Sequence, residues 1–207
     1  MFIGRLRAEE IDKEIDKVVD LHLAFLTTRL SGSPGRELLR LYYGALANGE
    51  CGVCLVSREE ATGMVQGAGV LRWGGGLMRR ALKRNPFFIP FLLVWHVLRR
   101  PVTLYHLSRQ FWERSPIKEL LKLLPGSPRW CLLHALVVEQ PGKGIGQCLT
   151  QALLEEARSR GFEYMITSTF EGNSANYLYR KSGFSLLLVT EEPEQKVNWY
   201  GRALSIG

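Results

Sequence analysis

The stretch that most constrains this chain is LVVEQPGKGIGQCLTQALLEEA, residues 136–157. It runs from an apolar, strand-like segment through a loop with glycines at 142, 144 and 146 into a helical pattern. A strand that ends in such a loop and opens a helix suits a ligand phosphate, because backbone N–H groups at the helix start can approach an anion closely. An ordinary tight turn is the alternative interpretation.

Two well-known phosphate loops fit these residues poorly. The loop of nucleotide triphosphatases needs a Lys followed by Ser or Thr after its last glycine, whereas Lys143 lies between the glycines. The dinucleotide fingerprint G-x-G-x-x-G also differs from the spacing found here, and no acidic residue ends the next strand-like segment, where Phe170 precedes Glu171. The loop therefore indicates neither a nucleoside triphosphate nor a dinucleotide.

Hydrophobic periodicity predicts an α/β chain. Strands are expected at 2–8, in a hairpin at 52–73, and at 130–139, 161–170, 184–192 and 197–206, with helices at 8–30, 33–49, 144–160 and 173–183. Proline-broken apolar runs between 77 and 127 predict several short helices inserted before the strand at 130.

A second motif follows the glycine loop in the chain. The loop itself reads PGKGIG, residues 141–146, and residues 173–184 read NSANYLYRKSGF, with an Asn, an Ala and a Tyr ahead of a Gly-Phe pair. Together, and in this order, the two motifs resemble those of the GCN5-related N-acetyltransferases. The resemblance implies a mixed, mostly antiparallel central sheet of about seven strands flanked by helices, in one domain over 1–207. It also implies acetyl-CoA as cosubstrate and no metal.

The chain departs from the family pattern at two positions. Pro141 stands where the family has Gln or Arg, and proline has no N–H to donate to a pyrophosphate. Asn173 lies six residues before Tyr179, whereas seven is usual. These departures concern single contacts with the coenzyme and the role of Asn173.

The glycine loop gives the resemblance a physical basis. N–H groups at the start of a helix offer a pyrophosphate several donors and the positive end of the helix dipole. The resemblance implies that the preceding strand pairs with the pantetheine arm as an added strand pairs with a sheet edge. The expected coenzyme-binding residues are Leu136, Val137, Val138, Gly142, Lys143, Gly144, Ile145, Gly146, Asn173 and Asn176.

Direct acetyl transfer needs an acid for the departing thiolate, a partner for the oxyanion and a base for the amine. Tyr179 occupies the family's general-acid position, although packing of the short helix is the alternative, and the N–H of Leu136 would polarise the carbonyl. His134, two residues before Leu136, is expected on the same strand face and is the first candidate base. A structural histidine, Glu139, Glu171 or a water chain are the alternatives.

The insertion at 74–128 is basic and aromatic. Residues 73–130 carry eleven Lys and Arg against two Glu, a charge of +9 in a chain of +7. Such a segment could shape the acceptor site, contact a membrane surface through 77–112, or form a homodimer face or a small helical core. No nucleic-acid-reading motif accompanies the charge, so no nucleic-acid partner is expected.

The sequence thus predicts an N-acetyltransferase that moves the acetyl group of acetyl-CoA to a primary amine of a small molecule or an amino sugar. A non-catalytic coenzyme-binding or membrane-surface protein of the same fold is the alternative. The start of the chain lacks a signal-peptide pattern, which predicts a cytoplasmic location. The CGVC pair at 51–54 is interpreted as small buried apolar residues, not a metal site.

Overall fold

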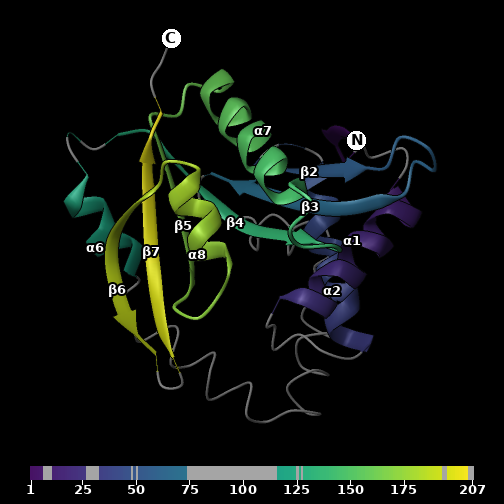
Figure 1. Ribbon diagram of the computed structural model, residues 1–207, viewed down its shortest axis with the longest axis horizontal. Coiled ribbons are helices and arrows are strands. Elements are labelled where there is room, and N and C mark those ends of the chain that lie inside the picture. The colour runs from purple at the N-terminus through teal and green to yellow at the C-terminus, as the bar shows by residue number, and fades with distance from the viewer. Residues whose placement is uncertain are drawn as a thin grey trace.

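The strand patterns assemble into one seven-stranded sheet with helices on both faces (Figure 1). The computed structural model describes residues 1–6, 11–26, 33–47, 49, 51–73, 116–124, 126, 128–192 and 195–204. The predicted helical insertion at 74–128 therefore lies largely outside the described residues, as does all of the segment 77–112 expected to contact a membrane. Within the described part of the insertion, residues 116–123 form a helix, α6.

The sheet is mixed and mostly antiparallel, as the motifs predict. Its strand order is β1-β2-β3-β4-β5-β7-β6, and β4 and β5 form the parallel pair while the remaining neighbours are antiparallel. The strands are β1 Phe2–Arg5, β2 Gly52–Arg58, β3 Val65–Arg72, β4 Trp130–Val138, β5 Tyr164–Phe170, β6 Ser185–Glu191 and β7 Lys196–Ala203.

Two groups of helices cover opposite faces of this sheet. On one face, here called the α7 face, α7 (Ile145–Ser159) and α8 (Ala175–Lys181) pack on a core that includes Leu133. On the other, the α1–α2 face, α1 (Ile11–Phe25) and α2 (Ser33–Ala47) pack on Val70 and Ala135. Helix α6 (Pro116–Leu123) lies in a separate cluster with Trp130 and Leu132.

Glycines on β3 allow α7 to approach the sheet closely. A Cβ added at Gly69 would lie 2.6 Å from Cδ1 of Leu153, and one at Gly67 would lie 3.1 Å from Cδ1 of Leu149. Real Cβ atoms do not approach a neighbour as closely as 2.6 Å, so a side chain at position 69 would force Leu153, and the packing of α7 around it, to shift. The pattern VQGAGV thereby fixes the height of α7 above β3 and β4.

Strand β4 contains a bulge at His134. Val70 of β3 pairs with Ala135 while Leu71 pairs with Leu133, so His134 is the extra residue. The bulge resets the alternation of side chains along β4. Beyond it, Ala135 packs in the core under α1 and α2, whereas Leu136 packs against the core under α7.

The expectation that His134 and Leu136 share one face of the strand is therefore wrong. The ring of His134 lies 5.8 Å from that of Tyr42 on α2, centroid to centroid, while Leu136 packs on the opposite side of the sheet. The regular two-residue period of a strand does not hold across a bulge. The histidine and the strand segment expected to bind the coenzyme consequently face different halves of the molecule.

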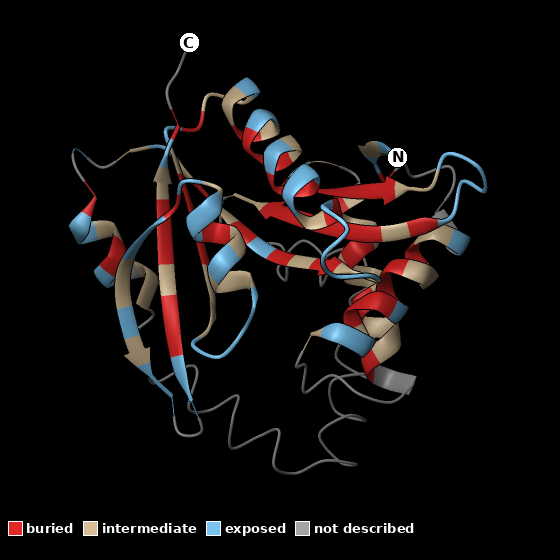
Figure 2. Ribbon diagram, viewed as in Figure 1, coloured by how far each residue is buried: buried red, intermediate tan, exposed pale blue. Residues whose placement is uncertain are grey.

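Burial follows the two cores (Figure 2). The CGVC pair behaves as small apolar residues, because Cys51 and Cys54 are both buried and burial raises the pKa of Cys54 to about 12. Cys148 on α7 is exposed. None of the helices that the structure describes is long and apolar enough to cross a bilayer.

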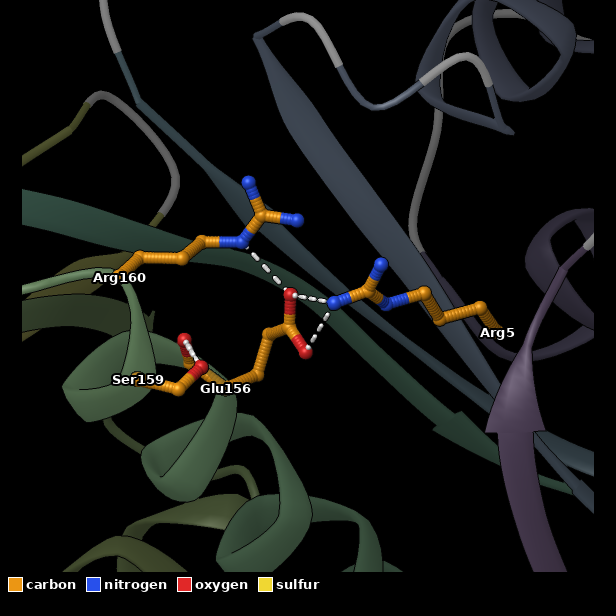
Figure 3. A network of polar contacts seen from close by, with 4 residues as sticks. All are labelled: Arg5, Glu156, Ser159 and Arg160. Carbon is orange, nitrogen blue, oxygen red and sulfur yellow. Dashed lines mark hydrogen bonds and ion pairs between the residues drawn. The ribbon is translucent and has the colours of Figure 1, made fainter.

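An ionic network ties the edge strand β1 to α7 (Figure 3). Nη2 of Arg5 donates to both carboxylate oxygens of Glu156, at 2.8 and 3.0 Å, and Nε of Arg160 donates to Oε1 at 2.6 Å. Arg160 also lies 4.3 Å above the ring of Trp73, the last described residue before the insertion. This end of α7 is therefore fixed both to β1 and to the end of β3.

Candidate active site

Strands β4 and β5 open a gap in the middle of the sheet. Their parallel register runs from Trp130 and Tyr164 to Leu133 and Thr167 and stops there, although both strands continue (Figure 1). Within the described chain, no strand pairs with the β5-facing edge of residues 134–138. Such an edge can accept an extended ligand through main-chain hydrogen bonds, which is the geometry expected for Leu136, Val137 and Val138.

The glycine loop lies directly after this edge. Gly142 and Gly144 have φ angles of 85° and 78°, and nothing lies within 4 Å of a Cβ added at either residue. Helix α7 begins at Ile145 without a side-chain hydrogen bond at its N-cap, Gly144. Its first N–H groups are thus left for a ligand, and the open space over the glycines fits a pyrophosphate. Lys143 is exposed on the same loop.

A hollow of about 780 Å³ extends from the loop along the exposed side of α7. Its other wall is formed by the C-terminal end of α8 and by β7. Neither Tyr179 nor His134 lines it. The lining residues are Ile3, Gly144, Gln147, Cys148, Gln151, Ala152, Glu155, Lys181, Ser182, Gly183 and Arg202.

Tyr179 of α8 is buried at the closed end of the β4–β5 gap. Its ring packs against Phe184 and Tyr200, with centroids 5.7 and 5.9 Å away. The phenol is hydrogen-bonded to the side chain of Thr167, whose Oγ1 lies 3.0 Å from the Leu133 carbonyl and donates to it. Burial raises the pKa of Tyr179, against a smaller lowering by Thr167. The phenol is therefore protonated at neutral pH. It lies at the point where β4 and β5 separate.

Asn176 anchors α8 in this position. Its side-chain oxygen accepts hydrogen bonds from Nδ2 of Asn198 and from the hydroxyl of Tyr200, both at 2.9 Å. Its Nδ2 donates to the carbonyls of Phe170, Glu171 and Asn173 at 2.7, 2.8 and 2.7 Å. An amide offers two donors and two lone pairs, all of which are used here. The observed contacts of Asn176 hold the helix that carries Tyr179, and its coenzyme contact stays a prediction.

Asn173 has a related structural contact. Its Oδ1 accepts a hydrogen bond from the backbone N–H of Ala175 at 2.9 Å, which caps the start of α8. Asn173 is exposed, and its predicted coenzyme contact is likewise not tested by this geometry.

Across the sheet, His134 belongs to a cluster of three polar side chains that we call the Tyr42–Arg72–His134 cluster. The Arg72 guanidinium lies 6.0 Å above the ring of Tyr42, which in turn stacks near His134. Part of the His134 side chain is exposed to solvent. Desolvation by the surrounding protein atoms, followed by the charges of Arg72 and His22, lowers its pKa to about 4. The imidazole is therefore neutral at pH 7 and available as a hydrogen-bond acceptor.

The alternative bases are placed less well. The Glu139 carboxylate forms an ion pair with Nζ of Lys17 in the middle of α1, at 2.7 Å. Glu171 is exposed, in the turn between β5 and α8. His134 remains the candidate at the bulge itself.

Sequence reasoning missed four residues that the fold brings to the site. Thr167 contacts Tyr179, Asn198 anchors Asn176, and Tyr42 and Arg72 surround His134. Each lies on a different element from its partner, and none belongs to a motif. Of the four, only Thr167 could have been predicted, because the alternation of side chains along β5 puts it on the α7 face.

The fold is that of known acetyltransferases. The aminoglycoside 6'-acetyltransferase type Ii structure superposes with a TM-score of 0.62 at 14% identity, covering 99% of this chain and 98% of that one. The Salmonella typhimurium protein yncA, solved with its cofactor acetyl-CoA, superposes with a TM-score of 0.58 at 15% identity, covering 99% and 94%. At such identities these likenesses establish the fold alone.

A sequence relative points the same way. The L-methionine sulfoximine/L-methionine sulfone acetyltransferases of Pseudomonas aeruginosa and Pseudomonas paraeruginosa are 38% identical to this chain over 76 residues. The match covers 35% of this chain and 42% of each relative, so it spans less than half of their length. No protein-family model matches the chain. The chain thus has the fold of these acetyltransferases, the mixed seven-stranded sheet with helices on both faces that its glycine loop and its Asn-Ala-Tyr motif predict.

Proposed function

We propose that this protein is an acetyl-CoA-dependent N-acetyltransferase that transfers the acetyl group directly to a primary amine of a small molecule. One observation carries the proposal: the β4–β5 gap has the glycine loop at its open end and the Tyr179 phenol at its closed end. A coenzyme arm lying along the edge of β4 would bring its thioester to the point where the two strands meet.

The two faces of the sheet divide the reaction. The coenzyme would approach from the α7 face, where the loop and α8 lie, and the acceptor from the α1–α2 face, where the Tyr42–Arg72–His134 cluster lies. The gap is where the described strands leave a passage between these faces. An amine on one side could thus meet an acyl carbon held from the other.

Acetyl-CoA supplies an activated acyl carbon and a thiolate leaving group. Tyr179 would protonate that sulfur, which suits a phenol whose raised pKa keeps its proton at neutral pH. Before doing so, its hydroxyl must turn from Thr167 toward the gap. A backbone N–H of β4, for which Leu136 is our candidate, would donate to the carbonyl oxygen as negative charge develops there.

His134 would accept a hydrogen bond from the amine. Its lowered pKa makes it a weaker base than an ordinary histidine, so it orients a free amine better than it deprotonates an ammonium ion. The proton would then pass to water, because the side chain is exposed. The acid limb of the rate profile should consequently report the acceptor amine and persist in His134→Ala.

The named substrates of the sequence relatives, L-methionine sulfoximine and L-methionine sulfone, support a small-molecule acceptor here. A binding protein without catalysis is the alternative that the experiment must separate. Calorimetry with acetyl-CoA measures binding, and release of free thiol across a panel of amino acids, amino sugars and polyamines measures transfer. Binding with amine-dependent thiol release is expected. Binding without release from any amine would leave a coenzyme-binding protein, and no binding at millimolar acetyl-CoA would overturn both versions.

A further inference from the structure

Arg72 is a cation on the candidate acceptor side. It is half-buried near the end of β3, on the same face as His134 and one strand away. It contacts Tyr42, both over the ring and near the hydroxyl, and among the residues that the structure describes it forms no ion pair with a carboxylate. Removing a guanidinium from water without a counter-ion costs folding free energy, and binding of an anionic ligand would offset that cost.

The Tyr42 hydroxyl lies beside this guanidinium. Its oxygen is buried and has no hydrogen-bond partner of good geometry among the described residues. Burial raises the pKa of Tyr42, with a smaller lowering by Arg72, so the phenol keeps its proton at neutral pH. Buried hydroxyls are normally hydrogen-bonded, and the neighbouring guanidinium is the group that can donate to this oxygen. Tyr42 thus positions Arg72, whose remaining N–H donors have no carboxylate partner among the described residues.

The position of these donors limits what could satisfy them. Neighbouring strands lie about 4.8 Å apart, so β3 is one strand spacing from β4, whose far edge borders the gap. An acceptor whose amine reaches the gap would therefore place any group bound to Arg72 only a few bonds from that amine. His134, at the bulge between them, would lie alongside the connecting atoms.

We infer that Arg72, positioned by Tyr42, binds a carboxylate of the acceptor, which is therefore a small amine with an acid group a few bonds away, as in an amino acid. A guanidinium binds a carboxylate through two parallel N–H donors. This inference rests on the proposed function, because it names the acceptor class of the same site.

The test compares L-amino acids with the matching L-amino acid amides as acceptors, by thiol release with acetyl-CoA. Both keep the α-amine, and the amide has the less basic and hence more often free amine, so any preference for the acid must come from the protein. The wild-type kcat/KM should favour the acids by about tenfold or more, as expected of a charge-assisted hydrogen bond. In Arg72→Gln this preference should disappear through a lower kcat/KM for the acids alone, and Arg72→Lys should keep part of it.

Lys13→Gln is the matched control, because it removes one positive charge from an exposed position on α1. It should leave the acid-to-amide ratio unchanged. Equal use of acids and amides by the wild type, or an unchanged ratio in Arg72→Gln, would overturn the inference while leaving the acetyltransferase proposal intact.

If no amine releases thiol, the proposed function fails and the inference is judged by binding alone. Calorimetry of the same acids and amides with the coenzyme-A-saturated protein then replaces the rate. Tighter binding of the acids that Arg72→Gln abolishes would sustain the carboxylate site. Absence of such a difference would refute it, and thermal unfolding of the variant shows whether a loss reflects misfolding.

Discussion

The two faces of the sheet meet at the β4–β5 gap but are built in different ways. On the α7 face, the candidate ligand groups are backbone amides and one phenol, and they come from two short stretches, 136–146 and 173–184. On the α1–α2 face they are the side chains of Tyr42, Arg72 and His134, which come from three elements far apart in the sequence.

The difference follows from what each face has to recognise. A pyrophosphate and an amide-bearing arm can be bound by main-chain groups, which any sequence supplies once glycines open the space. Selecting one amine among many needs particular side chains at particular places. In the proposed function, recognition on the α7 face would consequently depend on local motifs, whereas recognition on the α1–α2 face would depend on side chains that only the folded chain brings together.

Replacing Tyr179 by Phe tests the single side chain on which the α7 face depends for chemistry. We expect kcat to fall about 100-fold or more, because general acid catalysis typically contributes that much, with little change in acetyl-CoA affinity. Steady-state kinetics and calorimetry measure the two quantities. Tyr177→Phe, on the exposed side of the same helix, should behave as wild type. A normal rate in Tyr179→Phe would remove the phenol from the mechanism.

Asn176→Ala tests whether the other polar side chains of this face hold the scaffold or the coenzyme. The substitution removes the amide whose contacts join α8 to β7, to the end of β5 and to the turn between β5 and α8, so we expect a loss of about 3–4 kcal/mol in the free energy of unfolding. Asn173→Ala, which removes one cap, should cost about 1 kcal/mol. Denaturant titration gives both values. If Asn176→Ala instead kept its stability and lost acetyl-CoA affinity, the asparagine would be a coenzyme ligand.

The sequence predicts the α7 face well because its determinants are local. The strand, the glycine loop and the helix of 136–157 occur as expected, and residues 175–181 form the short helix that carries Tyr179. The glycines of VQGAGV are an exception, because they act on α7, which lies far from them in the sequence.

The α1–α2 face resisted prediction for two physical reasons. A bulge is set by the fit of two strands and not by the residue it contains, so nothing in LLHALVV places His134 opposite Leu136. Tyr42 and Arg72 also look ordinary in sequence, the one in a helical apolar pattern and the other at a strand end. Their meeting with His134 depends on how α2 packs on β3 and β4.

The free energy of unfolding should depend on pH because of a buried histidine, His22, on the α1–α2 face. Burial lowers the pKa of His22 from 6.5 to about 4, and its Nδ1 is 2.8 Å from the Tyr43 hydroxyl. Between these pH values the unfolded chain binds more protons, so stability falls as pH falls. We expect His22 to account for about 2 kcal/mol of the loss between pH 7.5 and 5.

His22→Gln removes this titration and can still hydrogen-bond Tyr43. Its unfolding free energy should therefore decline less steeply than that of the wild type over the same pH range, measured by denaturant titration. Carboxylates contribute equally to both proteins and cancel in the comparison. Parallel profiles would mean that His22 is not the source of the acid sensitivity.

Gly144→Ala gives the smallest expected effect and tests whether the α7 face truly recognises its ligand through open backbone. The residue has a positive φ of 78° and nothing within 4 Å of an added Cβ, so alanine should cost about 1 kcal/mol of stability through backbone strain alone. Gly63→Ala, in the β2–β3 turn, has the same features at a φ of 69° and should cost the same. Only the change at 144 should also weaken acetyl-CoA binding, by about tenfold, because its methyl group enters the space over the helix start. Thermal unfolding and calorimetry separate the two effects. Equal coenzyme affinity in both variants would show that the loop tolerates a side chain, and the pyrophosphate would then have to lie elsewhere along the edge of β4.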